Sequence, residues 1–228
     1  NDMRGVTGYE PIKFVSTAAH SGASKGTSDW PLFRTAEVYL NYAEAKAELG
    51  TLTKDDLLIS IDRIRDRAGM KGLDMAAANA NPDPFLLACY PNVTKSENTG
   101  VILEIRRERT IELVMEGLRM WDMFRWKEGA QLVNETNPYY GIYFSGPGLY
   151  DMDGDGRNDL ELYVDKQTSR PGDGLTVLRI GSDIILSDMA ENRGYVVAWS
   201  TLKYTWNEER DYLWPIPADQ RVLTGGRP

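Results

Sequence analysis

Apolar residues in the first half of the chain recur at the spacing of an amphipathic helix. Five residues of segment 32–50 recur at this spacing, namely Ala36, Tyr39, Leu40, Ala43 and Ala47. They lie mostly three or four residues apart, which matches the 3.6-residue turn of an α-helix and predicts a helix that ends at Gly50. Asp29 and Pro31 suit the cap and first turn of a helix, so we expect it to begin there.

A second helix is predicted over residues 55–69. Its apolar stripe consists of Leu57, Leu58, Ile61 and Ile64. Thr51 or Thr53 is available to cap its N-terminus, and Gly69 marks its end. The turn between the two helices is short, so we expect the pair to form an αα-hairpin.

The longest helical pattern covers residues 101–130, after a mixed stretch with room for one short helix near 84–89. The expected buried face of the long helix consists of Ile111, Val114, Leu118 and Trp121. Pairs of opposite charge at i,i+3 spacing occupy its other faces. Gly117 lies within this helix at a cost of about 1 kcal/mol relative to Ala, which predicts a close contact there.

The pattern changes after Gly129, because Gly, Pro, Tyr and Asp dominate the stretch 134–182. Short runs typical of strands occur at 140–144, 160–165 and 175–180. Two prolines bracket Ile216 near the C-terminus, so residues 212–223 are expected to be extended and then to turn. The fold is therefore predicted to be mainly α, with paired helices and an irregular, partly β second half.

Composition and charge narrow the functional classes. The chain has 228 residues, 42% of them hydrophobic and 10% aromatic, so it can form a large core. Its formal net charge of −8 argues against nucleic acid as a partner, because phosphate binding needs clustered Lys and Arg. One cysteine, Cys89, and one histidine, His20, exclude an intrachain disulfide and His-rich zinc sites. We interpret Cys89 as a core residue and His20 as a loop residue.

The sequence shows no recognisable targeting signal. No apolar run approaches the ~20 residues of a membrane helix. The N-terminal sequence NDMRGVTGYE has no apolar segment typical of a signal peptide and no initiating Met. Residues 86–89, LLAC, match a bacterial lipoprotein box, but they lie in mid-chain. We therefore expect the chain to be a piece of a longer protein.

Two groups of motif residues stand out, one in the long helical pattern and one near the C-terminus. The first group is Arg107-Glu108-Arg109, Glu112-Leu113, Glu116-Gly117, Arg119-Met120-Trp121-Asp122 and Arg125-Trp126. The second group is Leu213-Trp214-Pro215-Ile216-Pro217. In order and content they resemble the C-terminal half of the SusD/RagB family, over roughly residues 28–129 and 195–225.

The resemblance implies a SusD-like α-α superhelix of tetratricopeptide-type helix pairs, in which residues 1–228 are the C-terminal part of a single domain. It implies a lipid-anchored outer-membrane protein at the cell surface of Bacteroidota that binds glycans and is not an enzyme. The partners it implies are a glycan, a SusC-like TonB-dependent transporter and the N-terminal half of its own chain. That half would carry the signal peptide and the lipidated Cys.

The carboxylates of the helical motif have two interpretations. They are Glu108, Glu112, Glu116 and Asp122. Glycosidases use such carboxylates in pairs, which would make them catalytic. Arginines are interleaved with them, however, and Arg–carboxylate networks that fix helix packing explain the pattern better. Trp121 and Trp126 could stack on sugars, but on an apolar stripe they are expected to be core residues.

Aromatic residues gather in the loop 137–144. The faces of sugar rings are apolar and stack on aromatic side chains, while polar groups at the rim bind the hydroxyls. The candidates for carbohydrate contact are Tyr139, Tyr140 and Tyr143, with Trp30 and Trp206 as weaker ones. Ile142 and Phe144 are expected to attach the loop to the core, and a structural role for the three tyrosines is the alternative.

The acidic stretch 151–162, DMDGDGRNDLEL, has the spacing of a calcium loop. The candidate ligands are the side chains of Asp151, Asp153, Asp155 and Asp159 and the backbone carbonyl of Arg157. Gly156 permits the sharp turn at the sixth position. Leu162 stands where an EF-hand has its bidentate Glu, so the loop instead resembles those of integrin-type (FG-GAP) β-propeller repeats.

A solvated acidic turn is the alternative, but the offsets of the four aspartates favour calcium. We expect the ion to be structural, ordering residues 134–165 and so presenting the tyrosines. Three functions are then open. We favour glycan binding for nutrient uptake with a SusC-like transporter, ahead of a glycoside hydrolase or its accessory domain, and ahead of a helical protein-interaction scaffold.

Overall fold

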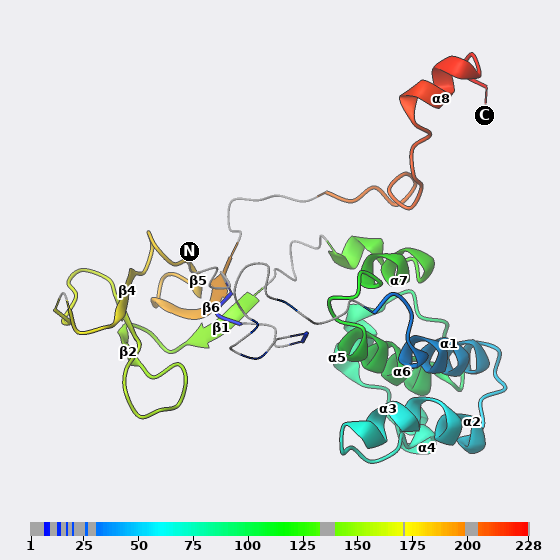
Figure 1. Cartoon of the computed structure of the whole chain (residues 1–228), viewed down its shortest axis with the longest axis horizontal. Helices are drawn as coiled ribbons and strands as arrows, with labels where there is room; N and C mark the ends of the chain where they lie inside the picture. Colours follow the sequence, from blue (N-terminus) through cyan, green and yellow to red (C-terminus); the bar gives the residue numbers. More distant parts are fainter. Residues whose placement is uncertain are drawn as a thin grey trace. The chain divides into compact units, whose positions relative to one another are not determined.

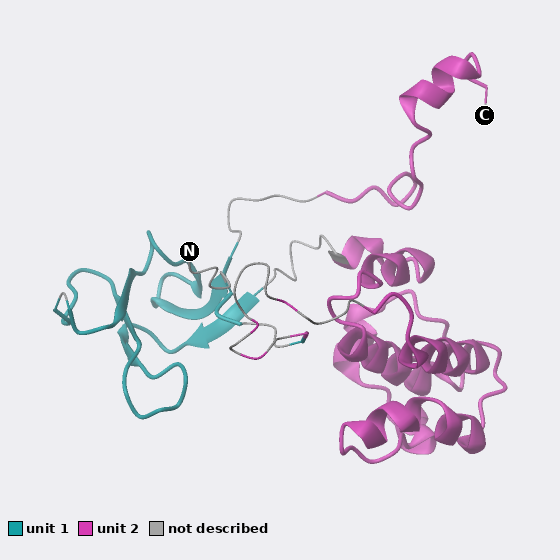
Figure 2. Ribbon diagram, in the orientation of Figure 1, with its two compact units in different colours: residues 1–13, 134–204 teal, residues 14–133, 205–228 magenta. Residues whose placement is uncertain are grey.

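The computed structural model of the chain consists of two compact units. The residues it describes are 7–9, 13–14, 17, 20, 26, 31–132, 140–170, 172–198 and 205–227. Figure 1 labels the helices and strands, and Figure 2 colours the two units. The helical unit comprises residues 14–133 and 205–228, and the β unit comprises residues 1–13 and 134–204.

Helix α1 (Thr35–Glu48) confirms the first predicted helix but begins four residues after Pro31, which was expected in its first turn. The helix ends as expected, because Gly50 adopts a φ of 69°, which glycine tolerates better than other residues. The predicted cap Asp29 lies outside the described residues. Arg34 holds the N-cap position without a side-chain hydrogen bond to the backbone.

The second predicted helix is divided into α2 (Lys54–Ile59) and α3 (Ile61–Arg67). A capping box starts α2, since the Thr53 hydroxyl accepts from the Asp56 N–H and the Asp56 carboxylate accepts from the Thr53 N–H. Ser60, at φ −126° and ψ −101°, lies outside helical geometry and shifts the phase of the stripe. Leu58 is therefore 49% exposed, although it was expected to be buried.

Two further short helices, α4 (Met75–Ala80) and α5 (Pro84–Cys89), precede the main helix of the unit. The bounds of α5 match the expected short helix, whereas the alanine-rich α4 was not expected. Helix α4 packs closely on α6 (Thr99–Glu112). A Cβ on Gly100 would lie only 1.9 Å from the carbonyl oxygen of Ala78, so only glycine fits at this crossing.

The predicted helix over 101–130 is wrong, because the chain turns after α6. Helix α7 (Arg119–Arg125) follows a turn in which Met115 and Gly117 have φ angles of 64° and 76°. These angles end the helix, so residues on either side of the turn do not share one face. Nothing lies within 4 Å of a Cβ on Gly117, so backbone conformation rather than a close contact explains this glycine.

The expected buried face of the long helix is wrong for the same reason. Three of its members are exposed, namely Ile111 (64%), Val114 (49%) and Trp121 (55%). The core instead collects the first two turns of α6 with α1, α3 and α7. Its buried members include Leu40, Ala43, Ile61, Val101, Ile102, Leu103, Ile105, Met123 and Trp126.

The described residues of the β unit form two three-stranded sheets. The first sheet is antiparallel, with the order β1 (Tyr140–Phe144), β6 (Arg193–Val197) and β5 (Leu186–Asp188). The second sheet has the order β2 (Gly148–Tyr150), β3 (Leu160–Tyr163) and β4 (Thr176–Arg179), with β3 and β4 parallel. The three predicted strands are confirmed as β1, β3 and β4, and the other three were not predicted.

The two sheets share one apolar cluster, which contains Phe144, Leu160, Leu162, Ile180, Leu186 and Val196. Phe144 and Ile142 pack in it, as expected for residues that attach this segment to the core. Thr7, a turn residue, contacts β1, because its carbonyl accepts from the Ile142 N–H at 2.9 Å.

The C-terminal segment 205–227 joins the helical unit through aromatic side chains. The Tyr212 hydroxyl accepts from the N–H of Gly129, at the start of the 3-10 helix η2 (Gly129–Leu132). Trp206 packs against Gly129, where a Cβ would lie 2.0 Å from the indole, so Trp206 is a packing residue. Beyond an extended stretch, helix α8 (Ala218–Leu223) has no buried residue.

The fold is thus a mixed α and β arrangement rather than the expected mainly α superhelix. The described residues contain the α-helices α1 to α8 and the strands β1 to β6. None of these helices has the length and apolar character needed to cross a membrane.

Candidate functional site

Three tyrosines gather on the exposed face of the first sheet. Tyr140, Tyr143 and Tyr195, which we call the tyrosine cluster, have exposed fractions of 44%, 53% and 45%. The Tyr195 ring stacks on that of Tyr140, with centroids 5.3 Å apart and planes at 18°. The Tyr143 ring meets Tyr195 edge-on, at 5.2 Å and 71°. The cluster therefore presents two ring orientations to solvent.

A β-bulge places Tyr140 and Tyr143 on the same face. Residues three apart on a regular strand point to opposite faces, because side chains alternate. Here Tyr140 pairs with Val197 and Tyr143 with Tyr195. The two pairs are therefore three residues apart on β1 but only two apart on β6. The extra residue restores both tyrosines to the face that carries Tyr195.

The backbone beneath the cluster is held by the core of the β unit. Gly194 and Val196 flank Tyr195 on β6, and both are buried on the opposite face. Phe144, next to Tyr143, is 3% exposed and packs edge-on against Tyr150 at 4.8 Å. Strands packed in this way hold the tyrosines on a rigid support, which lowers the entropy lost when a ligand binds.

Polar groups border the cluster on the same face. Arg193 lies two residues before Tyr195 and forms an ion pair with Asp188 at 3.5 Å, with both side chains about half exposed. The Ser187 hydroxyl accepts from the Tyr195 N–H at 3.0 Å and keeps its own proton for another acceptor. Aromatic faces beside such donors and acceptors suit a ligand that has both apolar faces and hydroxyl groups.

The structure brings together two of the three tyrosines expected to bind carbohydrate. Tyr139 lies outside the described residues, and so does the weaker candidate Trp30. Tyr195 was missed, although the strand RGYVV alternates buried and exposed positions and puts Tyr195 outward. The alternation within RGYVV can be recognised from the sequence, but the pairing of this strand with β1 cannot.

The acidic loop connects β2 to β3 and brings three of its aspartates together. Oxygen atoms of Asp151, Asp153 and Asp159 all lie within 4.8 Å of one another. Gly154 and Gly156 adopt φ angles of 79° and 86°, which turn the chain tightly around them. Three converging carboxylates form a donor set suited to a hard divalent cation.

Backbone N–H groups already stabilise the negative charge of this loop. Asp151 accepts from the N–H groups of Gly156 and Gly154, at 2.8 and 2.7 Å, and these bonds lower the pKa of its carboxyl. Asp159 accepts from the N–H of Met152 at 2.8 Å. The loop is therefore held in a compact turn by hydrogen bonds to its own aspartates.

The other two expected ligands, Asp155 and Arg157, are not among the three converging residues. The Asp155 carboxylate accepts from the Arg157 N–H at 2.7 Å and is not part of the three-residue group. Both side chains are exposed. The three converging aspartates are consistent with the calcium prediction, while the roles of Asp155 and Arg157 in it stay predictions.

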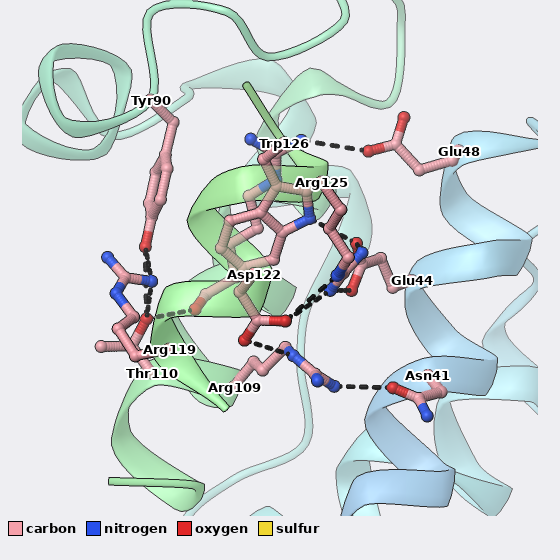
Figure 3. Close-up of polar contacts among 11 residues, drawn as sticks. Asn41, Glu44, Glu48, Tyr90, Arg109, Thr110, Arg119, Asp122, Arg125 and Trp126 are labelled. Carbon is pink, nitrogen blue, oxygen red and sulfur yellow. Dashed lines mark hydrogen bonds and ion pairs between the residues drawn. The ribbon is translucent and has the colours of Figure 1, made fainter. Parts of the chain in front are cut away.

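The motif carboxylates of the helical unit form ion pairs. Asp122 on α7 accepts from Arg109 Nε at 2.7 Å and from Arg125 Nη2 at 3.0 Å, as Figure 3 shows. Glu44 on α1 accepts from Arg125 and from Trp126 Nε1. Burial opposes the charge of Glu44, but bonds from Arg125 and Trp126 lower its pKa below the ordinary value.

The same holds for the other three motif carboxylates. Glu108 pairs with Arg65, Glu112 with Arg34 and Arg67, and Glu116 with Arg34. These pairs join different helices, so the structural interpretation of the pattern is confirmed. Trp126, at 6% exposed, is a core residue as expected. Trp121 is not, and it packs on Trp214 with ring centroids 5.9 Å apart.

The comparisons with known proteins agree with the motif residues. The model of the SusD family matches residues 2–226, which is nearly the whole chain. No curated protein and no solved structure matches the chain.

Proposed function

The chain belongs to the SusD family, and we propose that its tyrosine cluster binds a glycan for nutrient uptake. The observation that carries this proposal is the bulge in β1, which places the rings of Tyr140 and Tyr143 beside that of Tyr195. Without the bulge, one of the two would point into the core of the β unit. Exposed aromatic rings on a rigid strand are the usual support for a sugar ring.

The support for this site is physical. A sugar ring that stacks on tyrosine covers apolar area that would otherwise face water, at about 25 cal/mol per Å². Phenol hydroxyls, Ser187 and Arg193 can exchange hydrogen bonds with the hydroxyls at the edge of the ring. The family also supports a location at the outer-membrane surface and a SusC-like transporter as partner, and we include both in the proposal.

We also propose that the acidic loop binds calcium as a structural ion. Asp151, Asp153 and Asp159 would supply side-chain oxygens, with Asp155 and the Arg157 carbonyl completing the set. The loop is continuous with Tyr150, whose ring packs on Phe144, and Phe144 is next to Tyr143. Calcium would in this way stabilise the strand that carries the tyrosine cluster.

The glycan proposal is tested by substituting the central ring. Tyr195→Ala removes the ring that contacts both others and should lower glycan affinity at least tenfold, or about 1.4 kcal/mol, on a glycan array and by calorimetry. Tyr9→Ala is the matched control, because Tyr9 is a 61% exposed tyrosine of the same unit without a ring contact to the cluster. Equal affinity of both variants would contradict the proposal, and release of reducing sugar would favour a hydrolase.

The calcium proposal has a separate test. Asp151→Asn should abolish calcium binding measured by calorimetry, and chelation of the wild-type protein should loosen loop 151–159 in hydrogen exchange. Glycan affinity should fall with it, while helix content in circular dichroism stays unchanged. A chelator that changes neither the loop nor glycan affinity would rule out this role.

A further inference from the structure

The helical unit has a hollow of about 510 Å³ between α1 and α7. Its floor consists of buried charged side chains, whereas its rim carries polar side chains and an exposed tryptophan. The floor is formed by Glu44, Arg109 and Asp122, each no more than 5% exposed. The rim includes Glu37 and Asn41 of α1 and Trp121 of α7.

The floor of the hollow is electrically balanced. Arg109 pairs with Asp122, and Arg125 pairs with both Asp122 and Glu44 (Figure 3). The ion pairs of the floor therefore need no charged ligand to compensate them. The aromatic and polar side chains of the rim therefore determine which ligands the hollow can bind.

The rim offers one aromatic face and unused polar groups. Trp121 is 55% exposed, with Trp214 packed against it at 32°, so part of the indole is open to solvent. Asn41 accepts from Arg109 through Oδ1, which turns its amide nitrogen away as a donor, as Figure 3 shows. Among the described residues, the Glu37 carboxylate has no ion-pair partner and is a free acceptor.

We propose that this hollow is a second saccharide subsite that takes one uncharged pyranose ring of the glycan. The inference rests on the proposed function, and it adds a site in the other unit. The apolar face of the sugar would stack on Trp121. Its hydroxyls would accept from the Asn41 amide and donate to Glu37, so each polar group of the rim gains a partner.

The charge of the rim selects against acidic sugars. Glu37 and Glu48 are both acidic rim residues on α1, and of the two only Glu48 pairs with a cation of the described residues, Arg106 at 3.3 Å. A uronate carboxylate in the hollow would lie beside the unpaired Glu37 and be repelled. The subsite therefore favours neutral hexoses over uronic acids.

The test measures the ¹⁹F resonance of Trp121 while the protein binds sugars. The full chain is labelled with 5-fluorotryptophan, and the ¹⁹F resonance of Trp121 is assigned by its loss in Trp121→Phe. The protein is titrated with maltohexaose, cellohexaose, mannohexaose and hexagalacturonate. We expect at least one neutral hexasaccharide to shift the Trp121 resonance, and hexagalacturonate to leave it unmoved.

Two conservative variants separate a binding role from a structural one. Asn41→Asp keeps the acceptor for Arg109 but loses the donor, and should weaken the neutral sugar at Trp121 about tenfold. Glu37→Gln removes the charge and should let hexagalacturonate shift the Trp121 resonance. Neither change removes a contact of the floor, so both variants should keep the melting temperature of the wild type.

Tyr195→Ala distinguishes the subsite from the tyrosine cluster. The Trp121 shift should persist in Tyr195→Ala with the same midpoint, even where array binding is lost. A Trp121 resonance that stays fixed for every sugar up to about 10 mM overturns the subsite, whatever the tyrosine cluster does. An unchanged array profile of Tyr195→Ala, with Trp121 still shifting, overturns the cluster and leaves the subsite standing.

Discussion

The two units bury carboxylates in different ways. In the helical unit, Asp122 and Glu44 are neutralised by arginines, which come from α6 and α7. In the β unit, Glu161 is 2% exposed and forms no ion pair with any residue that the structure describes. It accepts from the N–H and hydroxyl of Thr168 and from the N–H of Ser169, at 2.5, 2.8 and 2.8 Å.

The contacts of the two units differ in the sequence separation of their partners. Arg109 and Asp122 are thirteen residues apart, and Arg125 and Glu44 eighty-one, so these pairs hold separate helices together. Glu161 and its donors are only seven or eight residues apart, so they hold one loop over β3. Loss of a charge partner should therefore destabilise the whole helical unit, whereas loss of the Glu161 contacts should release a local segment.

Arg109→Met should have the largest effect on stability. It removes the Nε donor to Asp122 and leaves a carboxylate that is 3% exposed with Arg125 alone. Breaking a buried pair by removing one partner costs about 3–5 kcal/mol. Urea denaturation followed by circular dichroism at 222 nm measures the loss. A change below about 1 kcal/mol would show that the network does not hold the helices together.

Gly100→Ala tests the close packing of the helical unit. Its Cβ would lie 1.9 Å from the Ala78 carbonyl oxygen, so α4 must move away from α6, at a cost of about 1–3 kcal/mol. Gly26→Ala is the control, because nothing lies within 4 Å of a Cβ there. Equal melting temperatures of the two variants would contradict the close approach of the helices.

The pH dependence of the β unit tests the Glu161 contacts. Donors of Ser169 and Thr168 lower the pKa of Glu161 to about 2, from an ordinary value near 4.5. Because the unfolded chain binds this proton more readily, the stabilisation is complete above about pH 4.5 and is lost as the pH falls towards 2. Hydrogen exchange of residues 160–170 at several pH values measures it.

Glu161→Gln is the matched variant for that measurement. The amide keeps one acceptor oxygen but cannot titrate, so protection of segment 160–170 should be lower at neutral pH and should depend less on pH. Protection that still falls between about pH 4.5 and 2 in Glu161→Gln would assign the effect to another carboxyl group.

Arg193→Ala should have the smallest effect on stability. Its pair with Asp188 is 3.5 Å long, and both side chains are about half exposed, so the loss should be less than about 1 kcal/mol. Thermal denaturation of the variant beside Arg109→Met measures the contrast between exposed and buried pairs. A loss of stability as large as that of Arg109→Met would show that the exposed pair stabilises the fold as much as the buried one.

Local signals of the sequence predicted much of the fold. Periodicity and the terminal glycine predicted α1 and its end, although not its start, and α5 has the predicted bounds, because these features depend on neighbours in sequence. The division at Ser60 and the turn at Met115 were not predicted. Met115 adopts a positive φ that its side chain disfavours, and the flanking Glu112 and Glu116 both pair with Arg34. Arg34 is about eighty residues away in sequence, so no local pattern reveals this contact.

The candidate site was partly predictable for the same reason. Tyr140 and Tyr143 were recognised from composition, and the spacing of the acidic loop from a local motif. Tyr195 joins them only through the pairing of β1 with β6, which are about fifty residues apart, and pairing partners are not local information. The exposure of Trp121 likewise depends on the turn after α6.

The bulge in β1 couples the conformation of this strand to the spacing of its tyrosines. Tyr140 and Tyr143 are three residues apart and share a face only because the bulge adds one residue. Deleting one residue between them would leave them two apart, and regular alternation would then keep both on the face of Tyr195 without a bulge. Within related proteins, two tyrosines spaced two apart on a regular strand are therefore equivalent to two spaced three apart across a bulge, whereas the three-residue spacing on a regular strand would lose the site.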